Sequence, residues 1–206
     1  YRYAKLAPGN ADPMADFEPI EMGGDSPISL FGHPVQALDE VTLDLEDRYV
    51  VEGLLDQDAI SVIYGLPNSG KSLLALDIAW HVATGQAWAG RDVQQGAALV
   101  LALEGRLGTT RRLKALCRSR PAPESEPPLY IWNGFLDLRQ RSTAKAIIEA
   151  ARRIEAQRRC PVRLVVIDTL ARAMPGADEN SGQDMGETIA TVDRIRSALN
   201  CHVCLV

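Results

Sequence analysis

The feature that most constrains the fold is an eight-residue segment, residues 65–72, which reads Gly-Leu-Pro-Asn-Ser-Gly-Lys-Ser. It fits the pattern G-x-x-x-x-G-K-[ST] at every fixed position. The apolar run 60–64 precedes it, and residues 72–84 follow with helical periodicity, up to a stop signal at Gly85. A strand, a tight loop and a helix in this order predict the first unit of an α/β fold.

The residue types in this segment suit the binding of a polyphosphate. Gly65 and Gly70 allow the backbone to curl so that successive N–H groups point at one anion, and the following helix adds its positive end. Lys71 supplies a mobile charge for the β- and γ-phosphates, and Ser72 offers a hydroxyl to Mg²⁺. The alternative is a strand-to-helix turn with an incidental lysine. The candidate nucleotide-binding residues are Gly65, Leu66, Pro67, Asn68, Ser69, Gly70, Lys71, Ser72 and Leu73.

Two acidic residues stand where apolar strands are expected to end. Asp168 closes the run 164–167 and is followed by Thr169, which could also contact the metal shell; Glu104 follows the run 97–103. Ligand sites of open α/β sheets lie at such carboxyl edges. We interpret Asp168 as a Mg²⁺ ligand and Glu104 as the general base for an attacking water. The alternatives are a turn cap and an exposed strand-end acid.

Further apolar runs and helical patterns alternate along the chain. The additional expected strands are 129–132, 163–167 and 201–206, and the additional helices are 109–119, 142–159 and 184–199. Continuous apolar strands predict a mainly parallel sheet covered on both faces. A capping box at Asp184 and Glu187 is expected to open the last helix. The side chains expected to face the core are Leu74, Ile78, Val82, Ile147, Ala151, Ile154, Ile189, Val192, Ile195 and Leu199.

Three segments together resemble a known family. Residues 65–72, the strand end Leu-Ala-Leu-Glu-Gly at 101–105 and the stretch Val-Ile-Asp-Thr-Leu-Ala-Arg at 166–172 resemble the RecA-like ATPases. They are most similar to the RepA-type hexameric replicative helicases of plasmids and phages. The loop 178–186 is similar to the loop that follows the metal-binding strand in that group, and the resemblance covers about residues 47–206.

The resemblance implies a RecA-like P-loop NTPase fold, with the strand 201–206 inserted between the phosphate-loop strand and the Asp168 strand. It implies that Lys71, Glu104 and Asp168 are catalytic, with ATP and Mg²⁺ as cofactors, and that Arg112 matches, within one residue, a basic residue aiding phosphate or subunit contact. It further implies a homo-oligomer, a hexameric ring in the full-length protein, that acts on single-stranded DNA in replication.

Three other functions share part of these motifs. They are a recombinase-like or regulatory ATPase that binds DNA or protein without unwinding, a small-molecule kinase, and a nucleotide-binding module without turnover. An acceptor pocket and an arginine-bearing lid would favour the kinase, and Glu104 at a strand end disfavours it.

Charge and composition divide the chain into two parts. Residues 1–60 carry 3 basic and 13 acidic side chains, whereas residues 61–206 carry 19 and 14. We expect residues 1–45 to be an acidic, Pro/Gly-rich irregular leader and residues 46–206 to be the ATPase core. Because the sequence stops inside an expected strand, we also expect the core to be truncated at its C-terminus, with sensor and arginine-finger residues beyond Val206.

Composition excludes several classes of protein. With 46% hydrophobic and 24% charged residues, and no apolar run near the ~20 residues that span a bilayer, we expect a cytoplasmic protein without membrane contact. Cys201 and Cys204 have metal-site spacing, but their apolar context favours a buried strand. Basic stretches at 106–120 and 152–163 could bind a phosphate backbone, although solvated helix faces are the preferred interpretation. Trp88 and Trp132 could meet a base, and a core role is preferred.

Overall fold

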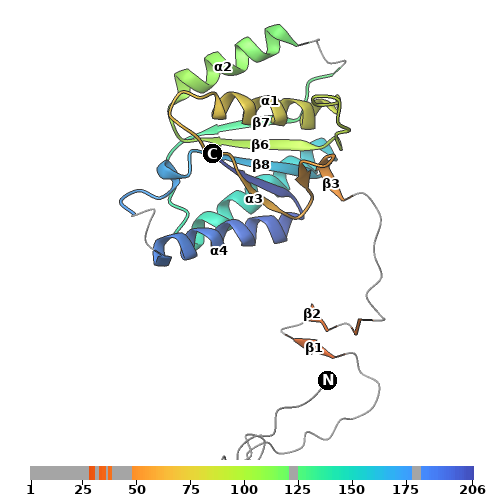
Figure 1. Cartoon of the computed structure of the whole chain (residues 1–206), viewed down its shortest axis with the longest axis vertical. Helices are drawn as coiled ribbons and strands as arrows, with labels where there is room; N and C mark the ends of the chain where they lie inside the picture. The colour runs from red at the N-terminus through yellow and green to blue at the C-terminus, as the bar shows by residue number, and fades with distance from the viewer. Residues whose placement is uncertain (1–27, 31–32, 36, 39–47, 121–124, 178–181) are drawn as a thin grey trace, which may run out of the picture. The chain divides into compact units, whose positions relative to one another are not determined.

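The computed structural model describes residues 28–30, 33–35, 37–38, 48–120, 125–177 and 182–206 (Figure 1). The chain divides into two compact units, Tyr1–Glu46 and Asp47–Val206. In the described part of the first unit, β1 (Ser29–Leu30) pairs antiparallel with β2 (His33–Pro34). This short ladder lies in the segment that was expected to be irregular; most of that leader lies outside the described residues.

A parallel sheet of five strands forms the centre of the second unit. Its order is β5-β9-β8-β6-β7, and every neighbouring pair is parallel. This confirms the α/β fold and the expected position of the last strand, β9, between β5 and β8. The strands are β5 (Ile60–Val62), β6 (Ala97–Ala102), β7 (Leu129–Asn133), β8 (Val162–Asp168) and β9 (His202–Leu205).

Helices cover both faces of this sheet, as the continuous apolar strands predict (Figure 1). The face with α1 and α2 has a core that includes Trp80 and Val100, and the face with α3 and α4 has one that includes Ile147 and Ile195. All four expected helices are present. Their bounds are α1 (Lys71–Thr84), α2 (Arg106–Ser119), α3 (Arg141–Arg158) and α4 (Gly182–Leu199).

Two side chains expected to face the core are exposed. Leu74 of α1 is 40% exposed and Ile189 of α4 is 38% exposed, whereas the other eight expected core positions of the helices are buried. The physical reason is helical drift. Residues at i and i+8 are about 80° apart around an α-helix, so Leu74 rotates away from Val82. Ile189 likewise lies at the border of the stripe that Val192 and Ile195 define.

The expected capping box at the start of α4 is wrong. The helix begins at Gly182, two residues before Asp184, so Asp184 lies in the first turn rather than at the cap. Its carboxylate instead accepts a hydrogen bond from Arg139 Nη1 at 3.4 Å. This contact of the carboxylate is therefore with the turn before α3, which the spacing did not suggest.

A second short ladder precedes the sheet and was not expected from the sequence. β3 (Tyr49–Val51) pairs antiparallel with β4 (Leu55–Asp56). The two strands together contribute Val50, Val51 and Leu55 to the α1-side core. A 3-10 turn, η1 (Ala171–Ala173), follows β8.

The strand at the end of the chain is buried, as its composition predicts. Cys201 and Cys204 are both buried, which confirms the interpretation of this segment as a core strand. Among the described residues, no group of three or more His, Cys, Asp and Glu side chains could hold a metal ion. No helix in the described part of the chain is long and apolar enough to cross a membrane.

Candidate functional site

The glycine-rich loop after β5 has the backbone geometry that its sequence predicts. Gly65 has φ 155° and Gly70 has φ 95°, conformations in which a side chain would be strained. Gly70 caps α1, a helix of 14 residues whose first turn contains no acidic side chain. The positive end of the helix dipole therefore lies at the loop without local neutralisation, as an anion site requires.

Lys71 lies across the loop. Its Nζ donates hydrogen bonds to the backbone carbonyls of Gly65 at 2.8 Å and Leu66 at 3.0 Å. The ammonium is thus held beside the first residues of the loop while its own backbone opens α1. Leu66 contributes its backbone carbonyl to this contact, and its side chain is exposed.

Asp168, the last residue of β8, lies beside the start of α1. Ser72 Oγ donates to Asp168 Oδ1 at 3.1 Å, and Asp168 is only 5% exposed. Burial is the largest influence on this carboxyl and raises its pKa; the hydrogen bond from Ser72 opposes the rise, and the charge of Glu104 adds to it. A hydroxyl and a carboxylate oxygen this close are hard oxygen donors of the kind that Mg²⁺ binds, so the residues fit that ion.

Glu104 reaches the same place from β6. Ala102 pairs with Asp168 in the parallel ladder, and the amide of Leu103 donates to the Asp168 carbonyl at 2.6 Å. Glu104 follows directly, and its Oε1 accepts a hydrogen bond from Thr169 Oγ1 at 3.3 Å. The structure therefore brings Glu104 and Asp168 together at the carboxyl edge of two adjacent strands. The peptide bond between Asp168 and Thr169 is cis.

A cavity of about 740 Å³ opens over the loop and both strand ends. This volume is within the ~300–1,000 Å³ range of small-molecule sites. The cavity is lined by every loop residue named from the sequence except Leu66, and by Glu104, Arg112 and Thr169. Asp168 does not line it, but accepts a hydrogen bond from Ser72, which does. The other lining residues are Val62, Ile63, Tyr64, Leu170, Ala171 and Val206.

Sequence reasoning did not assign a role to Tyr64, Leu170, Ala171 or Val206 in this cavity. Their shared signal is position: each stands within a few residues of the carboxyl end of β5, β8 or β9. An apolar residue at a strand end has no chemical mark of its own, so only the strand order shows which ends meet.

Some arginines of the two basic stretches outside the cavity pair with other groups of the protein. Arg120 pairs with Asp77, Arg152 Nη1 donates to Glu155 at 2.7 Å, and Arg158 Nε donates to the hydroxyl of Tyr130 at 2.6 Å. Such pairs favour the interpretation of these stretches as structural or solvated faces. Of the loop 178–186, residues 178–181 lie outside the described part of the chain.

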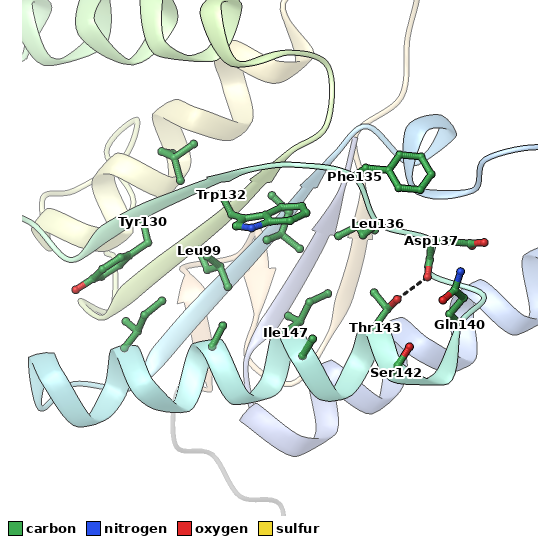
Figure 2. A pocket seen from close by; sticks show the side chains of 15 residues that line it. Leu99, Tyr130, Trp132, Phe135, Leu136, Asp137, Gln140, Ser142, Thr143 and Ile147 are labelled. Atoms are coloured by element: carbon green, nitrogen blue, oxygen red, sulfur yellow. Dashed lines mark hydrogen bonds between the residues drawn. The ribbon is translucent and has the colours of Figure 1, made fainter.

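A second hollow of about 580 Å³, which we call the groove, lies between β7 and α3 (Figure 2). Trp132 lines it and is 40% exposed, so the expected core role is wrong for this residue, since β7 is an edge strand of the sheet. Trp88 is partly buried against the α1-side core, and its Nε1 donates to Asp77 at 3.0 Å.

Comparison with known families gives one match. A family model described as an AAA domain matches residues 32–206, which include the loop and both strand ends. No curated protein sequence matches the chain.

Proposed function

We propose that this chain, which belongs to the AAA domain family, is an ATPase that hydrolyses Mg-ATP in the cavity over residues 65–72 and works as a motor on single-stranded DNA. Family membership supports nucleotide binding and hydrolysis in general. The observation that carries the proposal is that three elements meet at one place: the lysine-bearing loop and Glu104 line one cavity, and Asp168 accepts a hydrogen bond from Ser72 at its wall.

Each group has a role that its position supports. The loop amides and the Lys71 ammonium bind and orient the β- and γ-phosphates, in the manner of other phosphate-binding loops. Ser72 and Asp168 would hold the Mg²⁺ ion, which when bound neutralises phosphate charge. Glu104 is exposed to the cavity, so its carboxylate can orient a water molecule and accept its proton.

Turnover by the carboxylate variant tests the ATPase. In a phosphate-release assay with Mg-ATP, Glu104→Gln should keep nucleotide binding and lose turnover by about 100-fold or more. Glu149→Gln is the matched control, because Glu149 is an exposed glutamate on α3 outside the cavity. Unchanged turnover in Glu104→Gln would refute the assigned base.

The motor role rests on the resemblance to RepA-type helicases and is the finer part of the proposal. We expect single-stranded DNA to stimulate phosphate release and a forked duplex to be unwound. We also expect Mg-ATP to promote a homo-oligomer, which analytical ultracentrifugation should show to be a hexamer. DNA-stimulated hydrolysis without strand displacement would favour the recombinase-like or regulatory alternative. Nucleotide binding without phosphate release would leave a binding module.

A further inference from the structure

We propose that Thr169 is a positioning residue that holds the Glu104 carboxylate in place for its water molecule. The inference rests on the proposed function and deepens it. In the step concerned, the water oxygen bonds to the γ-phosphorus while the bond to the ADP oxygen breaks, and Glu104 takes the proton that the water loses.

The direction of the hydrogen bond is set by the chemistry of its partners. An ionised carboxylate can only accept, so the Thr169 hydroxyl donates its one proton to Glu104 Oε1 at 3.3 Å. Because Oε1 takes this bond, we assign Glu104 Oε2 as the oxygen that would accept the proton of the water. The cavity contains both residues, so the carboxylate is oriented on the side where the phosphates would lie.

Thr169 has a fixed backbone from which to hold a mobile partner. Its carbonyl accepts the amides of Arg172 and Ala173, each at 3.1 Å, at the start of η1. The next amide, that of Leu170, donates to the carbonyl of Val206 at 2.7 Å. Glu104 is exposed and precedes Gly105, which has φ 113°. The hydroxyl on the rigid segment therefore restricts the side chain on the freer one.

Electrostatics explains why Glu104 needs this restraint. Asp168 lies at the same edge, and two carboxylates repel each other; the charge of Glu104 contributes to the raised pKa of Asp168. Without a donor, the exposed Glu104 side chain would turn towards bulk water and away from the cavity. Thr169 is covalently next to Asp168, so one strand end supplies both the candidate metal ligand and the donor for the base.

The test is a comparison of Thr169→Val, which keeps the shape and removes the donor, with Thr169→Ser, which keeps the donor. We expect Thr169→Val to lower kcat for Mg-ATP about tenfold with an unchanged KM, and Thr169→Ser to stay within about twofold of the parent protein. Added to Glu104→Gln, Thr169→Val should cause no further loss, because both changes act through one group. A normal kcat in Thr169→Val, a loss confined to KM, or a further loss in the double variant would overturn the proposal.

A structural readout makes the test independent of turnover and of one variant's folding. Crystal structures of the parent chain and of Thr169→Val, Thr169→Ala and Thr169→Ser are compared. Glu104 should be turned out of the cavity in Thr169→Val and Thr169→Ala and should keep its parent position in Thr169→Ser. Glu104 unmoved in Thr169→Val or Thr169→Ala would overturn the inference. Absence of phosphate release by the parent protein would instead refute the proposed function, so the two failures are distinguishable.

Discussion

The cavity over the phosphate loop and the groove between β7 and α3 are two hollows beside the same sheet, and they differ in chemistry. The cavity is lined by a lysine, an arginine, a glutamate and the loop backbone. The groove is lined mainly by apolar side chains such as Leu99 and Ile147, with Trp132 and Phe135 at its opening (Figure 2).

Two polar residues of the groove, Asp137 and Thr143, take part in hydrogen bonds within the protein. Thr143 Oγ1 donates to the Asp137 carbonyl at 2.7 Å (Figure 2). Arg139 binds the Asp137 carboxylate, and its hydrogen bond holds the pKa of Asp137 below its usual value. At the cavity, the exposed residues Glu104 and Arg112 both line the hollow, beside the lysine of the loop. Apolar volume alone therefore does not mark the reactive site; the convergence of polar groups on a shared space does.

The largest expected effect separates the two hollows by nucleotide chemistry. Lys71→Ala should lower Mg-ATP turnover about 1,000-fold, because under the proposed function it removes the ammonium that would bind the phosphates. Phosphate release and nucleotide binding by calorimetry measure it. Lys145→Ala is the control, since Lys145 is an exposed lysine on α3, and it should leave both unchanged. Equal losses in the two variants would remove the distinction between the regions.

The groove should respond in stability and not in nucleotide binding. Ile147 is buried beside the groove, so Ile147→Ala should lower the free energy of unfolding by about 2–3 kcal/mol. Phe135 lines the same groove but is 76% exposed, and Phe135→Ala should cost less than about 0.5 kcal/mol. Urea denaturation measures both. A large loss of nucleotide affinity in Ile147→Ala, with the fold intact, would show that the groove is coupled to the cavity.

Asp168→Asn sharpens the comparison within the cavity, because here function and stability should oppose each other. The pKa of Asp168 is raised in the folded chain, so its charged form costs stability at neutral pH, and the cost disappears as pH falls below the unfolded value near ~3.9. The melting temperature of the nucleotide-free variant should therefore be about 2 °C higher than that of the parent chain. The same variant should need more Mg²⁺ for turnover. A lower melting temperature would contradict this account of the carboxylate.

The smallest expected effect concerns His202 of β9, the strand that pairs with β5, which leads into the phosphate loop. Its Nδ1 donates to the Asp56 carbonyl at 2.7 Å, and its Nε2 accepts from Ser61 Oγ at 2.8 Å. Burial lowers the pKa of His202, so the neutral ring stabilises the fold above the unfolded value near ~6.5, and this stability is lost as pH falls through the folded pKa. Melting temperatures at pH 7.5 and 5.5 should differ less in His202→Gln than in the parent chain. An identical pH dependence would contradict it.

Much of the fold was predictable because its signals are local. The apolar runs at β6 and β8 and the alternating helices indicate a covered parallel sheet, and all five of its strands were found. The β3–β4 ladder was not predicted, because its strands of three and two residues are too short to show a periodicity and no motif follows them; β5 is as short as β3, but the phosphate-loop motif that follows it marks it. Asp184 shows the same limit at side-chain level, because its hydrogen bond with Arg139 joins two parts of the chain that are distant in sequence.

The sequence by itself determined the loop, the helix that follows it and the acids at two strand ends. Each is marked by a pattern of consecutive residues: a glycine and lysine motif, a helical periodicity, or an apolar run that ends in an acid. The resemblance already implied that β9 separates β5 from β8, whereas only the tertiary structure showed the hydrogen bonds from Ser72 to Asp168 and from Thr169 to Glu104. The physical reason is that these contacts join residues 65 to 96 positions apart. Their distances follow from strand order and register, which packing of the whole sheet selects and no single segment encodes.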